Sequence, residues 1–347
     1  MTITRLLSST VLTGLMFLGV SSPACAQALF DAHAILPVRI EAPLDTLVRE
    51  RPDEDYLDAR FVFSGTDGQE HAFDIKVQTR GKFRRKKSTC SFPPVRLNFR
   101  KEDLQGSIFE GQDKLKLVTH CDTRRERYEQ LTLREYLAYR ILNTLTDKSF
   151  RARLMHITWA DTENDVETFT RYGFVIEDDD TVGKRLGMQA LETEKLSYRD
   201  LDQPHTNLVT VFEYMIGNTD YSLVRGPEGD ECCHNAVPFS DGKVVWPVPY
   251  DFDFSGLVDA PYADPAPQFK IRSVRTRVYR GRCSNNELLP GTLAAIVARK
   301  PQLYGLVDAL ADLDDRNRKE VTRYLDSFFK IAEDQRKVQR ELIRECS

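Results

Sequence analysis

Apolar and polar residues alternate along much of the first half of the chain, as they do in strands with one buried face. Residues 60–64 and 71–79 form two such runs around the turn Thr66-Asp67-Gly68, so we expect a β-hairpin there. Further strands are expected at residues 95–99, 115–117, 154–159 and 172–176. Leucine or isoleucine at positions 133, 137, 141 and 145 predicts a helix. The first half therefore predicts a mostly antiparallel sheet with one helix packed on it.

The second half has mainly helical spacing. The apolar positions of its first helix are Leu208, Val211, Phe212 and Met215. This helix is expected to end at Gly217, because glycine is the usual C-cap residue. Two short strands, residues 235–239 and 243–246, flank the turn Ser240-Asp241-Gly242, and helical stripes recur over the last 60 residues. The whole chain therefore predicts an α+β fold, with a β-rich lobe at residues 27–177 and a mainly helical lobe at residues 178–347.

Composition excludes several classes of protein. The chain has 347 residues, of which 41% are hydrophobic, so it can bury a large core and is not a disordered chain. Its 49 Lys and Arg residues against 53 Asp and Glu residues give a net charge of −4. Dedicated nucleic-acid binders are usually strongly basic, so we expect no nucleic-acid partner.

The first 26 residues have the pattern of a signal peptide. Arg5 precedes the apolar run at residues 6–20, and Ala24-Cys25-Ala26 gives the small-x-small pattern, so we expect cleavage after Ala26. No later run is long and apolar enough for a transmembrane helix, so we expect an exported mature chain, periplasmic or secreted, without a membrane span. Lipidation of Cys25 is the alternative, although Ser22-Pro23-Ala24 matches a lipoprotein signal poorly.

Export decides how the cysteines are interpreted. The cysteines after the expected cleavage site are Cys90, Cys121, Cys232, Cys233, Cys283 and Cys346. An even number in an oxidising compartment predicts up to three disulfides. We expect Cys232 and Cys233 to bond distant partners, since adjacent cysteines rarely bond each other. The alternative is a zinc site from Cys232, Cys233 and His234 with His120 and Cys121, for which the chain offers no Cys-x-x-Cys spacing.

Three polar segments could carry chemistry together. Asp220 follows the helix that ends at Gly217, Asn235 begins the next strand, and Asp251 follows the turn of the second strand pair. The turn should return Asn235 and Asp251 to the same end of the paired strands. Phosphoryl transfer with Mg²⁺ needs such groups: one carboxylate orients the acceptor hydroxyl, while an amide oxygen and another carboxylate hold the metal. Taken singly, each aspartate could be an ordinary turn residue or cap.

On these residues the chain resembles the CotH family of spore-coat protein kinases, which belongs to the atypical kinase-like proteins. The matching segments are Arg80-Gly81, Pro94-Val95-Arg96-Leu97-Asn98-Phe99, residues 114–117, 133–139 and 173–177, Asn218-Thr219-Asp220, Asn235 and Tyr250-Asp251-Phe252-Asp253. They follow the family's order over about residues 75–256. The Asn-Thr-Asp and Tyr-Asp-Phe-Asp segments are the specific part of the match.

The resemblance implies a two-lobed, protein-kinase-like fold with a cleft for ATP. Asp220 matches the catalytic aspartate, Asn235 a metal-binding amide, and Asp251 the aspartate that binds Mg²⁺ or Mn²⁺. Asp253 is a further metal candidate, or a cap of the segment that follows it. The acceptor implied is a protein or a small molecule with a hydroxyl group.

The resemblance also implies phosphate-binding residues. Arg80 and Gly81 match the loop over the phosphates, and Glu177 matches a glutamate near the hinge between the lobes. The chain departs from the family in having the basic run 82–87 where small residues are usual, and Phe92-Pro93 where lysines are usual.

The missing lysine shifts the expected cation on the phosphates to another residue. By position, that cation is Arg96 or Lys116. Both would present positive charge to a phosphate.

Export limits the supply of ATP, and occupancy of a nucleotide site depends on the ratio of ligand concentration to Kd. The leading expectation is Mg²⁺-dependent transfer from ATP, or from another phosphoryl donor. One alternative is a catalytically inactive, kinase-like binding module of the cell envelope that holds an anion or a partner. Another is a structural envelope protein held together by disulfides.

Overall fold

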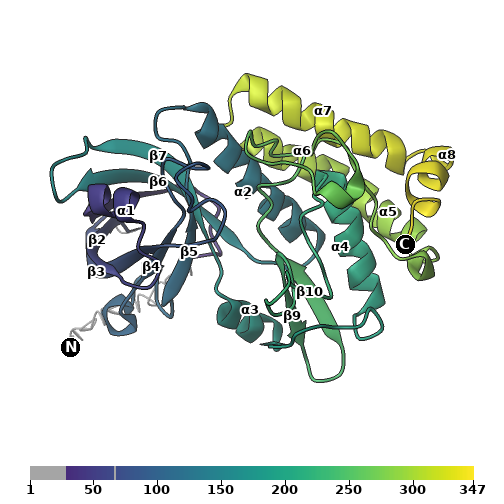
Figure 1. Ribbon diagram of the computed structural model, residues 1–347, viewed down its shortest axis with the longest axis horizontal. Helices are drawn as coiled ribbons and strands as arrows, with labels where there is room; N and C mark the ends of the chain where they lie inside the picture. The colour runs from purple at the N-terminus through teal and green to yellow at the C-terminus, as the bar shows by residue number, and fades with distance from the viewer. Residues whose placement is uncertain (1–28, 66–67) are drawn as a thin grey trace, which may run out of the picture.

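The computed structural model describes residues 29–65 and 68–347 (Figure 1). The expected signal peptide, and Thr66 and Asp67 of the expected turn, lie outside the described residues. The described chain is an α+β protein, which confirms the predicted class. A closed β-barrel forms one end, and helices with a small second sheet form the other. We call these the barrel region and the helical region.

The barrel is built from strands that follow the alternating pattern of the sequence. They are β1 (Leu36–Ala42), β2 (Leu57–Ser64), β3 (Glu70–Thr79), β4 (Val95–Asn98), β5 (Lys114–Val118), β6 (Ala152–Asp161) and β7 (Phe169–Ile176). Their order is β1-β2-β3-β4-β5-β7-β6. The predicted hairpin is confirmed, since β2 and β3 pair antiparallel with Leu57 opposite Val77 and Ser64 opposite Glu70.

The sheet expected for the first half closes on itself, and the closing strand β1 is one that the pattern analysis misses. β1 pairs antiparallel with β2 and parallel with β6, so Val38 faces Phe63 on one side and Ile157 on the other. Closure leaves neither β2 nor β6 as an open edge. Helix α1 (Leu44–Glu50), which follows β1, is also missed.

Helix α2 (Arg127–Leu145) confirms the helix predicted in the first half. It packs against later helices as well as against the sheet. Its Leu137 is buried in the same core as Phe174 of β7, Phe212 of helix α4 (Gln203–Ile216) and Phe328 of helix α7 (Asp315–Ala332). The inside of the barrel has a separate core. Figure 1 shows α2 between the barrel and the later helices, so this helix joins the two regions.

The helical region begins after β7. Its helices are α3 (Asp179–Leu186), α4 (Gln203–Ile216), α5 (Leu289–Ala298), α6 (Lys300–Ala309), α7 (Asp315–Ala332) and α8 (Gln335–Val338). Its sheet has the order β10-β9-β8, with β8 (Gln189–Ala190), β9 (Ala236–Ser240) and β10 (Val245–Pro249). Short helical turns are η1 (Lys101–Leu104), η2 (Pro267–Phe269), η3 (Cys283–Asn285) and η4 (Gln339–Ile343). No helix in the described part of the chain could cross a membrane.

The disulfides bring one confirmation and one correction. The pairs are Cys90–Cys121, Cys232–Cys233 and Cys283–Cys346, so all the expected cysteines are bonded. The expectation that Cys232 and Cys233 reach distant partners is wrong. It rested on the rarity of bonds between adjacent cysteines, whereas Cys232 and Cys233 are bonded to each other, with Cα atoms 3.0 Å apart. The segment with Cys232 and Cys233 is therefore not linked to the C-terminal segment, where Cys283 bonds Cys346.

Candidate functional site

A cleft of about 590 Å³ lies between the two regions. The barrel region contributes Arg80, Gly81, Arg96 and Lys116 to its lining. The helical region contributes Asp220, His234, Asn235, Asp251 and Asp253. The structure therefore brings together all of the residues predicted for catalysis, metal binding and phosphate binding, with the exception of Glu177.

Glu177 lies outside this cleft, and its carboxylate is already paired. Arg185 donates to both of its oxygens at 3.0 and 2.7 Å, and the backbone N–H of Arg151 donates to one of them at 2.7 Å. The side chain is almost fully buried. In this structure Glu177 joins β7 to helix α3 and does not face the predicted phosphate residues.

The position of Asp220 is set by the end of helix α4. Gly217 caps that helix with φ of 69°, as predicted, and a Cβ there would clash with the hydroxyl of Tyr324. The side chain of Asn218 then accepts a hydrogen bond from the backbone N–H of Asp220 at 2.9 Å. Because Asn218 makes the local turn, the carboxylate of Asp220 is left to face the cleft.

The carboxylate of Asp220 is held by its two neighbours in the cleft. Its Oδ1 lies 2.9 Å from Nε2 of His234, and its Oδ2 accepts from Nδ2 of Asn235 at 3.1 Å. The same Nδ2 also donates to the backbone carbonyl of Asp220 at 2.6 Å. The hydrogen bond to Asp220 raises the pKa of His234, against the opposing effect of burial. His234 is a site residue that the sequence analysis considered only as a zinc ligand.

Asn235 and Asp251 lie at the same end of the β9–β10 pair, as predicted. Asn235 precedes β9 and Asp251 follows β10, while Ala236 and Pro249 are paired across the strands. Both Asn235 and Asp251 have a left-handed backbone, with φ of 52° and 64°. Such conformations are unfavourable for residues other than glycine and are concentrated at functional sites. The N–H of Asp251 donates to the hydroxyl of Tyr139 at 2.9 Å, which fixes its backbone.

Two oxygen ligands in the cleft remain available. The carboxylate of Asp251 has no hydrogen-bond or ion-pair partner among residues 29–65 and 68–347. Within the same residues, Asn235 uses its amide nitrogen on Asp220 and leaves its amide oxygen without a partner. Oxygens of this kind are the ligands that Mg²⁺ prefers, together with phosphate and water. The two residues therefore fit a metal that is shared with a bound phosphate.

The facing wall of the cleft is cationic. Arg96 of β4 lies opposite Lys116 of β5 in the sheet register, and Arg80 follows β3. Neither Arg80 nor Arg96 has a side-chain ion pair within the described chain. Lys116 lies 3.3 Å from the carboxylate of Asp179 and 5.1 Å from the ring of Tyr250. Guanidinium groups without a protein partner are suited to bind phosphate oxygens.

Arg84 lies behind this wall in a buried cluster with two acids. Its guanidinium is 3.6 Å from Glu135 of helix α2 and 3.9 Å from Asp253. The hydroxyl of Tyr262 donates to Asp253 at 3.0 Å. Burial, followed by the nearby charge of Asp251, raises the pKa of Asp253 to about 7, although Arg84 opposes this. Burial also raises the pKa of Glu135 well above its ordinary value.

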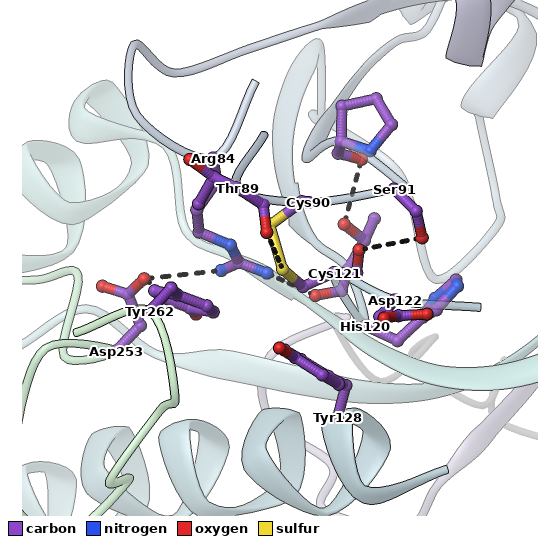
Figure 2. The surroundings of a disulfide bond; sticks show 12 residues. Arg84, Thr89, Cys90, Ser91, His120, Cys121, Asp122, Tyr128, Asp253 and Tyr262 are labelled. Carbon is purple, nitrogen blue, oxygen red and sulfur yellow. Dashed lines mark hydrogen bonds and ion pairs between the residues drawn. A yellow bond between two sulfur atoms is a disulfide. The ribbon is translucent and has the colours of Figure 1, made fainter. Parts of the chain in front are cut away.

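The buried cluster holds the basic loop, residues 82–87, against the helical region. Figure 2 shows Arg84 reaching from that loop to Asp253, beside the Cys90–Cys121 disulfide. The disulfide joins the loop to the chain just after β5. Arg51 donates to the carbonyls of Cys90 and Ser91 at 2.7 and 3.1 Å. The loop over the cleft is therefore fixed rather than free.

Sequence reasoning missed Arg84 and Glu135 as members of the site. Each carried one signal: Arg84 belongs to the basic run 82–87, and Glu135 lies in segment 133–139, which is part of the resemblance. Which member of the run is buried depends on how the loop folds over α2. No sequence pattern states that.

Metal binding by the protein alone receives no support. Among the described residues, no group of three or more His, Cys, Asp or Glu side chains could hold a metal ion. The zinc alternative needs thiolates from Cys121, Cys232 and Cys233, and all three are in disulfides. A metal bound through Asn235 and Asp251 would need further ligands from a substrate or water.

A second groove, of about 780 Å³, adjoins the cleft. It is lined by helix α3, β8 and β9, and shares Glu231, Cys233 and Tyr250 with the cleft.

Comparison with known proteins found no relative: no family model and no curated protein matches this chain.

Proposed function

We propose that the protein is an exported, two-lobed kinase-like enzyme of the CotH type that transfers a phosphoryl group from ATP to a protein or small hydroxyl acceptor. The observation that carries the proposal is the pairing of opposite chemistries across one cleft. Arg80 and Arg96, which have no ion-pair partner among the described residues, line the same cleft as Asn235 and Asp251. A metal-bound polyphosphate is a ligand that satisfies both walls at once.

Each residue then has a defined role. Arg80, Arg96 and Lys116 bind the donor phosphates, and Gly81 lets the loop backbone approach them. Asn235 and Asp251 would hold Mg²⁺ or Mn²⁺, which neutralises charge on the transferring phosphoryl group. Asp220, fixed by His234 and Asn235, orients the acceptor. The adjoining groove at α3 and Tyr250 has room for the nucleoside.

Asp253 has a different role in this proposal. Its carboxylate is engaged by Tyr262 and Arg84, so it holds the basic loop against the helical region. The three disulfides support the exported location, because such bonds persist in oxidising compartments.

Thermal unfolding of the oxidised mature chain tests the proposal. Millimolar Mg-ATP should raise the Tm of the wild type by a few degrees, since a ligand at about 100 times its Kd adds roughly 2.7 kcal/mol. Asp251→Asn should fold and lose this shift, because the amide is a poorer metal ligand. EDTA should abolish the wild-type shift. The matched control Asp264→Asn, at an exposed position outside the cleft, should keep it.

The same variants separate the alternatives. Asp220→Asn should keep the Mg-ATP shift and lose phosphoryl transfer, since it changes the acceptor side of the cleft. A shift without any transfer in the wild type would identify a binding module. A folded wild type with no shift would remove the nucleotide proposal and favour a binding module for another anion or a partner, with the structural envelope protein as the remaining alternative.

A further inference from the structure

The cleft contains a histidine that the proposed roles use only as a support. His234 lines the cleft, and its side chain is 35% exposed. Its Nε2 lies 2.9 Å from Oδ1 of Asp220. Its Nδ1 has no hydrogen-bond partner among the residues that the structure describes. One ring nitrogen is therefore fixed by a carboxylate while the other is open.

We propose that Nδ1 of His234 accepts the phosphoryl group and forms a phosphohistidine before the group passes to an external acceptor. The inference rests on the proposed function, because it needs a phosphoryl donor in the same cleft. It assigns the first acceptor to this chain itself. Histidine is an established covalent nucleophile when its ring is oriented by a neighbouring group.

The hydrogen bonds of the site fix the orientation of the ring. Asp220 binds His234 through Oδ1, and is itself held through Oδ2 by Asn235 and through its backbone N–H by Asn218. An oxygen that accepts from Nε2–H selects the tautomer with the lone pair on Nδ1. With both oxygens engaged, Asp220 is arranged to orient an imidazole.

The charges around His234 suit the product. A phosphoryl group on Nδ1 carries negative charge into the cleft that Arg80, Arg96 and Lys116 also line. Arg80 and Arg96 have no ion-pair partner in the described chain and are available to it. Arg280, Asp220 and Asp251 also act on the ring, and two further acids, Asp230 and Glu231, line the same cleft.

The step balances without any further reagent. The lone pair of Nδ1 attacks the γ-phosphorus, and the bond from that phosphorus to the bridging oxygen breaks. The electron pair of the broken bond leaves with ADP. The ring becomes cationic, and its Nε2 proton stays in the hydrogen bond with Asp220, whose negative charge stabilises it. Attack by an acceptor hydroxyl or water on the phosphohistidine later restores the neutral ring and releases one proton.

Labelling with ATP that carries the label in its γ-phosphate tests the inference. The oxidised full mature chain is incubated with Mg²⁺ and this ATP, and the protein-bound label is divided between alkali and acid treatment. A phosphohistidine survives alkali and is lost in acid, whereas phosphoserine and phosphothreonine survive acid. We expect an acid-labile label, and a phosphate on the peptide that contains His234 in mass spectrometry run without acid.

Matched variants assign the label. His234→Gln keeps an N–H donor for Asp220 but has no nucleophilic ring nitrogen, so its label should fall to background while its Mg-ATP thermal shift remains. His156→Gln, on β6 with its ring stacked 4.5 Å from Tyr172, should keep the label. If His234→Gln fails to fold, the labelled wild-type peptide still decides the site.

The other outcomes overturn the inference in distinguishable ways. An acid-stable label alone would mean that a hydroxyl accepts directly, which supports the phosphotransferase and excludes the histidine. A thermal shift without any label would keep the nucleotide site and exclude phosphorylation of His234. Absence of both shift and label would remove the proposed function and, with it, this inference.

Discussion

The cleft contains two groups of acidic residues that differ in burial and in partners. Asp220 and Asp251 are half-buried and face open space, and the carboxylate of Asp251 has no partner in the described chain. Glu135 and Asp253 are buried and share the guanidinium of Arg84. We call the first pair the open acids and the second the buried acids.

The difference assigns separate tasks to the same residue type. A buried carboxylate loses its hydration and keeps its charge only through a close cation, so the buried acids are committed to Arg84. The open acids keep oxygens available for a ligand. The Asp-Phe-Asp segment is therefore divided: Asp251 lines the open part of the cleft, and Asp253 contacts Arg84 of the basic run 82–87.

Removal of Arg84 should give the largest loss of stability. Arg84→Met leaves Glu135 and Asp253 buried without their cation, which should lower the free energy of unfolding by about 3–5 kcal/mol. Lys86→Met, at an exposed position in the same loop, should change it by less than about 0.5 kcal/mol. Denaturant unfolding at pH 8 and pH 5 measures both. The Arg84→Met loss should be smaller at pH 5, where the buried acids can be neutral; equal losses would contradict this account.

Removal of the loop disulfide should have a similar but smaller effect. Cys90→Ser with Cys121→Ser opens a link across 31 residues, which should lower stability by roughly 3–4 kcal/mol. It should also weaken the Mg-ATP thermal shift, because the loop with Arg80 is no longer fixed. Cys283→Ser with Cys346→Ser is the comparison, since it should lower stability and keep the shift. A shift unchanged in both would show that the loop does not bind the donor.

Glu213, a buried acid outside the cleft, should give the smallest effect on stability. Burial raises the pKa of Glu213 on α4 to about 8, against Asn218 and Arg280. Its neutral form is the stable one in the fold. Its contribution to the free energy of unfolding is therefore fully present below pH 4.5 and is lost as the pH rises towards 8. Glu213→Gln does not titrate and should gain on the order of 1–3 kcal/mol at pH 8 relative to pH 5.

The pH series of Glu213→Gln needs an exposed control. Glu287→Gln, at an exposed position, should follow the wild-type curve. Thermal unfolding from pH 5 to pH 8 compares the three proteins. A Glu213→Gln curve parallel to the wild type would mean that this carboxyl is not held neutral.

Much of the candidate site could be predicted because its signals are local. Gly217 marks the end of α4, and the turn between β9 and β10 places Asn235 and Asp251 at one end of the strand pair. Apolar residues recur at every second position in a strand and at every third or fourth position in a helix. This spacing depends only on which face of the element is buried. The role of Glu177 was implied by the resemblance and not by a local pattern, and its pairing with Arg185 depends on the packing of α3 against β7.

The sequence by itself determined the order and type of most elements, and the polar residues that meet in the cleft. Tertiary structure alone decided that β1 closes the barrel, that Cys232 bonds Cys233, and that Arg84 is buried between two acids. The physical reason is the range of the interactions. Periodicity and caps follow from neighbours along the helix or strand, whereas closure, ion pairing and disulfide choice depend on which distant segments the two cores bring together.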